Sequence, residues 1–167
     1  MSVIFTQPLT RAAFSAYGEV IETEGAAHYP INDGHCERYH ALARSEAKGE
    51  GGQIAVSIFR AQPYALPMQL TMMERHPLGS QAFMPLSENP FLVVVAPDEN
   101  GKPGTPDAFI TRPGQGVNYP PNLWHGVVTP LDMAQDFLVV DRIGEGNNLE
   151  TFFFSTPYEI RRSTETS

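Results

Sequence analysis

The apolar segments of this sequence are short, and each is closed by proline, glycine or a charged residue. FLVVVAP, residues 91–97, is a continuous apolar run with the length of a buried strand. QIAVSIFRA, residues 53–61, alternates instead and places Ile54, Val56 and Ile58 on one face of an extended chain. The 15 prolines and 14 glycines are spread along the chain rather than gathered in a linker. Many strands without a βαβ rhythm predict an all-β barrel or sandwich.

The remaining segments fit the same plan. Further strands are expected in AFITRPG, GVNYPP, HGVVTPL and DFLVVDR, with SEAKGEGG and APDENGKPGTPD as polar loops. One short helix is expected near the start, with Thr10 as its N-cap, Phe14 and Tyr17 on one face, and Gly18 ending it. A chain of 167 residues is expected to form one domain, residues 1–167. Its last seven residues, RRSTETS, are expected to be disordered.

Charge and cysteine content narrow the class of protein. The formal charge is -8 and the sequence has no basic stripe, so a nucleic-acid partner is not expected. The single cysteine, Cys36, cannot form an intramolecular disulfide, and we interpret it as a structural thiol without a role in chemistry. With neither a signal-peptide pattern nor an apolar run of transmembrane length, the expected location is the cytoplasm and no membrane partner is expected.

A charged triplet interrupts the segment LTMMERHPLGSQAFMPL, residues 70–86. If this segment is a strand, alternation places four side chains on one face: Leu70, Met72, Glu74 and His76. A carboxylate and an imidazole would then point the same way as core-type apolar residues, and each would need a partner there. The plain interpretation is that Glu74 pairs with Arg75 or another arginine, and that Met72 fills the core.

Two spaced motifs carry the candidate chemistry. ERHPLGSQ gives Glu74, His76 and Gln81 in the pattern E-x-H-x4-Q, which resembles a degenerate form of the first cupin motif, H-x-H-x3–4-E. GQGVNYPPNLWHG gives Gly114, Pro120 and His125 in the pattern G-x5-P-x4-H, which resembles the second cupin motif. Asn122 stands where that motif has its second glycine. The plain alternative for His125 is a core histidine whose hydrogen bonds are satisfied.

Longer blocks resemble the ureidoglycolate lyase family, once called ureidoglycolate hydrolase, from about residue 14 to about residue 150. The blocks are ERYH, FRAQP, MERHPLGSQAFMPL, VVVAP, AFITRPGQGVNYPPNLWHGVVTPL and DFLVVDR. The resemblance implies a cupin-type jelly-roll barrel with a short N-terminal helix, and a homodimer. It also implies a carbon–nitrogen lyase that splits (S)-ureidoglycolate into glyoxylate and urea in allantoin and purine breakdown. Nickel is the metal that the resemblance suggests, and no organic cofactor is expected.

Within that resemblance the inner face of the barrel is the active site. Glu74 and His76 would point inward, His125 would converge on them, and Gln81 would lie at the edge. Glu74, His76, Gln81 and His125 are the expected metal ligands, since nitrogen and oxygen donors suit nickel, zinc, manganese or iron. This chain has Glu and Gln where the first motif has His and Glu, so the alternative is a metal-free site in which Glu74 and His76 act as an acid–base pair.

The substrate is a small anion, and its carboxylate calls for a bidentate cation. Arg60 and Arg142 each follow an apolar strand and are the candidates, with a surface ion pair as the plain alternative for either one. Tyr39, Asn118 and Gln81 are expected to add hydrogen bonds to the substrate.

Two other functions compete with the lyase. One is a different metal-dependent cupin, an oxygenase or a sugar isomerase, and Glu74 and Gln81 count against an iron oxygenase. The other is a non-catalytic cupin that binds a small acid. Turnover of ureidoglycolate distinguishes the lyase from such a binding protein.

Overall fold

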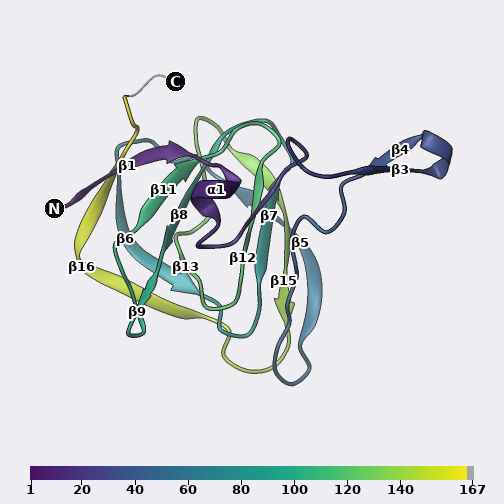
Figure 1. Ribbon diagram of the computed structural model, residues 1–167. Coiled ribbons are helices and arrows are strands. Elements are labelled where there is room, and N and C mark those ends of the chain that lie inside the picture. The colour runs from purple at the N-terminus through teal and green to yellow at the C-terminus, as the bar shows by residue number, and fades with distance from the viewer. Residues whose placement is uncertain (165–167) are drawn as a thin grey trace.

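The computed structural model describes residues 1–164. Strands make up 51% of it and helix 4%, which confirms the all-β prediction. The single α-helix, α1 (Arg11–Phe14), has four residues. No helix in the described part of the chain has the length and apolarity that a membrane crossing requires. Figure 1 shows the strands gathered into one body, from which a hairpin extends to one side.

One layer is a five-stranded antiparallel sheet. Its strands, in spatial order, are β2 (Glu19–Ile21), β12 (Gly116–Tyr119), β7 (Gln81–Pro85), β15 (Gln135–Ile143) and β5 (Gln53–Ala61). β5 is an edge strand, paired on one side only.

The second layer is a seven-stranded sheet that closes on itself, because β8 pairs with β11 as well as with β13 and β14. Its strands, in spatial order, are β11 (Asp107–Ile110), β1 (Val3–Pro8), β16 (Glu150–Arg161), β6 (Met68–Arg75), β13 (Trp124–His125), β8 (Phe91–Ala96) and β14 (Thr129–Pro130). A closed barrel of this kind is consistent with the expected cupin jelly roll.

Two apolar clusters lie on opposite faces of β8. Phe91, Val93 and Val95 belong to the first cluster, which includes Phe83 and Val139 of the five-stranded sheet. Leu92, Val94 and Ala96 belong to the second cluster, on the other face of β8. Both faces of this strand are therefore buried, which explains why FLVVVA has no polar alternation.

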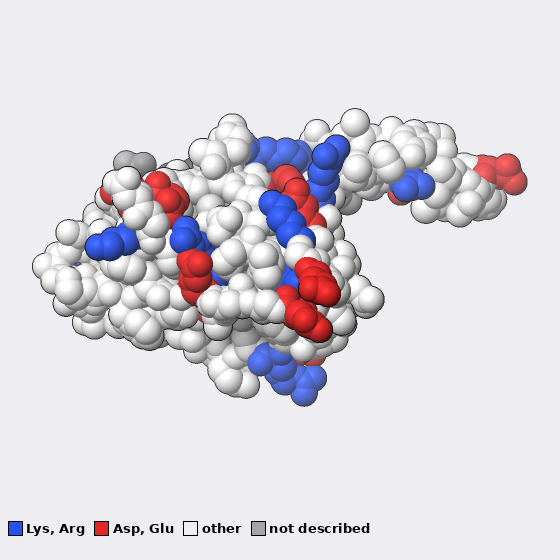
Figure 2. Space-filling model, turned by 90° about the horizontal axis from the view of Figure 1, so that it is seen from below, with Lys and Arg blue, Asp and Glu red and all other residues white. Residues whose placement is uncertain are grey.

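Two short hairpins complete the strands. β9 (Asp98–Glu99) pairs with β10 (Lys102–Pro103). β3 (Tyr29–Ile31) pairs with β4 (Cys36–Arg38) across the 3-10 turn η1 (Asn32–Gly34). We call residues 28–40 the arm. Figures 1 and 2 both show the arm extending away from the body of the molecule.

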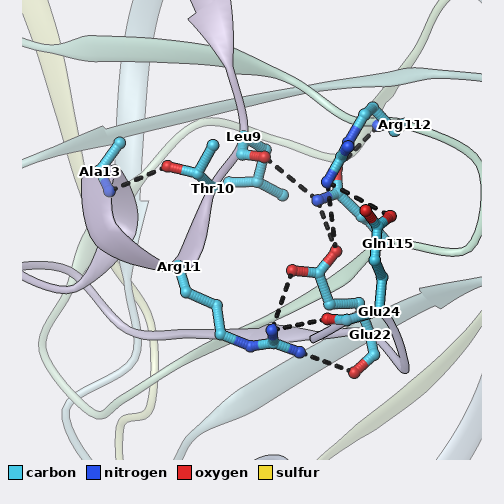
Figure 3. A network of polar contacts seen from close by, with 8 residues as sticks. All are labelled: Leu9, Thr10, Arg11, Ala13, Glu22, Glu24, Arg112 and Gln115. Carbon is cyan, nitrogen blue, oxygen red and sulfur yellow. Dashed lines mark hydrogen bonds and ion pairs between the residues drawn. The ribbon is translucent and has the colours of Figure 1, made fainter. Parts of the chain in front are cut away.

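A polar network anchors the N-terminal segment to the five-stranded sheet (Figure 3). Thr10 caps α1 as expected, its hydroxyl accepting from the Ala13 N–H. The buried carboxylate of Glu22 accepts a hydrogen bond from Gln115 at 2.7 Å and lies 3.6 Å from Arg11 and 3.8 Å from Arg112. A buried carboxylate with two cations and a hydrogen bond is compensated for its lost hydration.

Three expectations need correction or limits. Leu70 packs in the second cluster together with Met73, so strict alternation from Leu70 to Glu74 is wrong; the register between β6 and β16 shifts opposite this stretch. Ile54, Val56 and Ile58 do share a face of β5, but that face is exposed. β16 continues to Arg161, so disorder over the whole tail is wrong, and residues 165–167 lie outside the described residues.

Candidate active site

Glu74, His76 and His125 converge at the side of the barrel that faces the five-stranded sheet. Glu74 is the last residue but one of β6, and His125 of the short strand β13 lies directly opposite it. His76 follows β6 by one residue, and its ring centroid is 5.2 Å from that of His125. One ligand atom from each residue can be chosen so that all three lie within 4.8 Å of one another. We call these three residues the cluster.

The chain holds His76 from two sides. Its Nδ1 lies 2.8 Å from the carbonyl of Asn148, and its own carbonyl accepts from the Asn122 N–H at 3.0 Å. Asn122 has a φ of +68°, a left-handed conformation that asparagine tolerates, and this explains how it replaces the second glycine of the cupin motif.

His125 is buried and neutral. Burial lowers the pKa of its imidazole to about 3, opposed by its backbone hydrogen bond and assisted by nearby His76. Its ring stacks on Tyr119 at 4.5 Å, and its Nδ1 lies 2.9 Å from the carbonyl of Gly126. At neutral pH this ring therefore offers a lone pair rather than a charge.

The tautomer of both histidines follows from their partners. A carbonyl oxygen only accepts, so Nδ1 of each ring carries the proton and donates it. The Nε2 atoms then carry the lone pairs, and both are buried without a hydrogen-bond partner. The interpretation of His125 as a satisfied core histidine is wrong, since one of its nitrogens has no partner.

Glu74 differs from Glu22 in the same protein. Within residues 1–164, no Lys or Arg pairs with Glu74, and its Oε1 lies 4.0 Å from His76 Nε2. Arg75 pairs instead with Asp98 and Glu150, so the expected alternative of a Glu74–Arg75 pair is wrong. The side chain of Glu74 is 23% exposed, which leaves the cluster reachable from solvent.

These residues fit a divalent metal ion. Two imidazoles whose Nε2 atoms have no hydrogen-bond partner and one carboxylate without a Lys or Arg partner form a nitrogen–oxygen donor set of the kind that borderline divalent ions prefer. Histidines that hold metals commonly donate their other ring N–H to a carbonyl, as both rings do here.

Gln81 lies in the row of side chains beside the cluster. It is buried, opposite Tyr119 of β12 on one side and Asp141 of β15 on the other. Its Oε1 is buried without a hydrogen-bond partner. Gln81 is therefore placed next to the Tyr119 ring on which His125 stacks.

The structure brings neither expected arginine to the cluster. Arg60 is exposed and pairs with Asp136, and it lies five residues along β5 from Ala55, which is opposite Asp141. That spacing is about 16 Å along an extended strand. Arg142 is buried, and its guanidinium donates to the carbonyls of Lys48, Glu50 and Glu145.

Two expected hydrogen-bond donors also lie apart from the cluster. Asn118 alternates with Tyr119 along β12, and its amide donates to Glu19 and to the carbonyl of Arg44. Tyr39 lies on the arm, where its ring packs at 4.9 Å from that of His28.

Tyr119 and Asp141 also lie beside the cluster, and Asp141 was not among the expected site residues. Tyr119 is buried, and its pKa is raised by burial and then by the charge of Glu74, so its hydroxyl keeps its proton. Asp141 follows the buried residues Phe137 and Val139 at two-residue spacing, which is the signal that could have identified it.

A large hollow of about 750 Å³ lies elsewhere, lined by the 63–67 segment together with Leu131, Asp132, Arg161 and Arg162. It contains neither a histidine nor a second carboxylate beside Asp132. Its lining offers no acid–base pair, so the cluster is the better candidate for chemistry.

Comparisons with known proteins show the family of the chain. A family model described as ureidoglycolate lyase matches residues 1–161. A ureidoglycolate lyase of Chelativorans sp. (strain BNC1) is 61% identical over 96% of this chain and 97% of its own length. One from Mesorhizobium japonicum is 59% identical over 96% of this chain and 98% of its own. A solved dTDP sugar isomerase from Desulfovibrio desulfuricans G20 is similar over 80% of this chain and 82% of its own at 17% identity, with a TM-score of 0.46.

Proposed function

This chain belongs to the ureidoglycolate lyase family, and on that premise we propose that it splits (S)-ureidoglycolate into glyoxylate and urea at the cluster. The evidence for this reaction is the similarity to a ureidoglycolate lyase at 61% identity over nearly the whole chain. The convergence of Glu74, His76 and His125, with two unpartnered Nε2 atoms, is the observation that supports the site.

The reaction moves one proton. In ureidoglycolate a single carbon bears a hydroxyl, a carboxylate and a urea nitrogen. As the hydroxyl loses its proton, its electrons form the carbonyl of glyoxylate and the carbon–nitrogen bond breaks. The departing nitrogen takes a proton and leaves as urea, so no oxidant, reductant or water is consumed. A group that accepts the proton from oxygen and returns it to nitrogen is sufficient.

Glu74 is the group we assign to this proton. Its carboxylate has no Lys or Arg partner in the described chain and is partly open to solvent. The Tyr119 hydroxyl, which stays protonated, is available as a neutral hydrogen-bond donor beside it. The imidazoles of His76 and His125 place a ligand nitrogen close to Glu74, and their Nε2 atoms have no hydrogen-bond partner.

Glu74, His76 and His125 are the residues that would hold a divalent ion, with Gln81 as a fourth donor. Nickel is the ion that the family resemblance suggests. Such an ion, when bound, supplies a Lewis acid that lowers the pKa of a hydroxyl on the substrate. His76 and His125 contribute by directing Nδ1 to a backbone carbonyl, which turns Nε2 toward the site.

Glyoxylate release from the two resolved enantiomers of ureidoglycolate, followed by ultraviolet absorbance of the hydrazone, tests this function. The purified protein should consume the (S) enantiomer, and His76→Ala and His125→Ala should each lose roughly 10²–10⁴-fold in rate. His35→Ala, on the exposed turn of the arm, is the matched control and should keep the wild-type rate. Glyoxylate release no faster than in buffer would rule out the lyase and favour a binding protein.

We further propose that two copies associate through the exposed face of β5. Ile54, Val56 and Ile58 on this edge strand are 44%, 66% and 55% exposed, and contiguous apolar patches commonly mark interaction sites. The arm is a second surface that a contact between copies would stabilise, since an isolated two-stranded hairpin is at best marginally stable in water. Sedimentation velocity measures the association directly. A single domain over residues 1–167 and a cytoplasmic location remain predictions.

A further inference from the structure

Asp141 carries a half-buried carboxylate that the proposed reaction does not use. It lies on β15 directly opposite Gln81, and its Oδ2 accepts a hydrogen bond from Gln81 Nε2 at 3.1 Å. In the part of the chain that the structure describes, Asp141 forms no ion pair. A carboxylate placed here is therefore bound only by a neutral amide, which is an uncommon arrangement for a group that is partly removed from water.

The carboxylate fixes the orientation of the Gln81 amide. Because a carboxylate only accepts, the NH2 group of Gln81 must face Asp141, and Oε1 must lie on the other side of the amide. That oxygen is buried and has no partner. On that side, Gln81 is directly opposite Tyr119, the residue on which His125 stacks. Gln81, with its unpartnered oxygen, therefore belongs to the row of residues that leads to the cluster.

Asp141 lies outside the cluster and is hydrogen-bonded to Gln81, which lies beside it. The ligand atoms that lie together belong to Glu74, His76 and His125, and Asp141 is not among them. A neutral amide is a weak ligand by itself. A carboxylate that accepts a hydrogen bond from a metal-binding side chain orients that side chain and raises its basicity. The hydrogen bond to the charged carboxylate also polarises the side chain.

We propose that Asp141 is a positioning residue for the metal site, which holds the Gln81 amide so that Oε1 becomes the fourth donor beside Glu74, His76 and His125. The first cupin motif has a glutamate where this chain has Gln81. Asp141, on the neighbouring strand, supplies a negative charge in place of that glutamate, and it is hydrogen-bonded to Gln81. This inference rests on the metal site of the proposed function.

Isothermal titration calorimetry of the metal-free protein with Ni²⁺ tests the inference without relying on turnover. Asp141→Ala should raise the Kd for Ni²⁺ by about 10–100-fold, the usual effect of removing a group that orients a metal ligand. Asp141→Asn keeps an oxygen that accepts from Gln81, so it should recover much of the affinity. Asp136→Ala removes the same charge from the exposed face of the same strand and should bind Ni²⁺ like the wild type.

A double-mutant cycle shows whether Asp141 acts through Gln81. In a Gln81→Ala background, adding Asp141→Ala should leave the Kd unchanged, because the amide that Asp141 orients is gone. Additive losses, or an Asp141→Ala variant that binds Ni²⁺ as tightly as the wild type, would overturn the inference. A wild type that turns over ureidoglycolate but binds no Ni²⁺ would also overturn it while the lyase reaction stands. A wild type without turnover would count against the reaction itself.

Discussion

At the scale of single residues, the carboxylates of Glu22 and Glu74 have opposite surroundings. Glu22 has two arginines and a glutamine amide around it, so it is a structural anion (Figure 3). Glu74 has a histidine at 4.0 Å and, within residues 1–164, no other charged partner. The difference separates a carboxylate that stabilises the fold from one that is available for chemistry.

Glu74→Gln tests that availability. A glutamine side chain keeps the size of glutamate but cannot accept the hydroxyl proton at neutral pH, so kcat for glyoxylate release should fall by about 10²–10⁴-fold. The melting temperature should stay near that of the wild type, since no ion pair is broken. Glu88→Gln, an exposed residue with the same chemical change, is the control. A Glu74→Gln variant with nearly wild-type kcat would remove Glu74 from the proton transfer.

Residue by residue, the sequence predicted the cluster but not its surroundings. Glu74, His76 and His125 could be predicted because two motif spacings and strand alternation both depend on local sequence. The surroundings of Arg60 and Arg142 could not, since their partners come from segments up to 94 residues away. Strand alternation from Phe137 and Val139 also places Asp141 on the inward face, so Asp141 could have been predicted. The prediction chose the neighbouring charged residue, Arg142, instead.

At the scale of elements, strands β6 and β13 position Glu74 and His125, and loops position His76. The segment 76–80 lies between two of them: Lys48 N–H donates to the Leu78 carbonyl, and Asn148 binds both His76 and Leu78. Arg142 ties these two loops together by donating to carbonyls at positions 48, 50 and 145. Its role in this structure is to hold backbone.

Arg142→Lys distinguishes this role from the expected grip on the substrate carboxylate. A lysine ammonium cannot bond the same spread carbonyls, so the free energy of unfolding should fall by about 2–3 kcal/mol. The KM for ureidoglycolate should stay within about twofold, since the guanidinium is already occupied by backbone. Thermal unfolding and steady-state kinetics measure the two effects. A stable variant with a greatly raised KM would instead assign the carboxylate to Arg142.

The strand pattern was read correctly where both faces of a strand are buried or one face meets the other sheet. Where an apolar face meets no other part of the described chain, the pattern identified the residues that share the face but not that the face is exposed. The alternation of Ile54, Val56 and Ile58 is as regular as that of a core strand, yet all three are exposed. Alternation indicates which residues share a face, but the partner of that face depends on tertiary or quaternary contacts.

At the scale of the whole molecule, two surfaces are unusual for a protein that stays monomeric. One is the apolar face of the edge strand β5, and the other is the arm. Figure 2 shows acidic and basic side chains interspersed over the face seen from below, with the arm projecting beyond them. A two-fold contact would cover the same surface on both copies at once.

Val56→Asp tests the association. Val56 is the most exposed of the three apolar residues on β5, and a two-fold contact would place the introduced charge in the interface twice. We expect the dissociation constant measured by sedimentation to rise at least about tenfold, which corresponds to roughly 1.4 kcal/mol. Val3→Asp, at an exposed valine on β1, is the control. Association unchanged by Val56→Asp would exclude this face as the interface.

Metal analysis joined to a turnover assay tests the claim that Glu74, His76 and His125 form a metal-assisted lyase centre. Freshly purified protein is analysed for bound metal, and glyoxylate release is measured before chelation, after chelation and after adding back Ni²⁺. We predict a stoichiometric ion in the wild type that is lost in His125→Ala, with turnover that falls on chelation and returns with Ni²⁺. Full turnover by wild-type protein that holds no metal would contradict the claim and leave Glu74 and His76 as an acid–base pair.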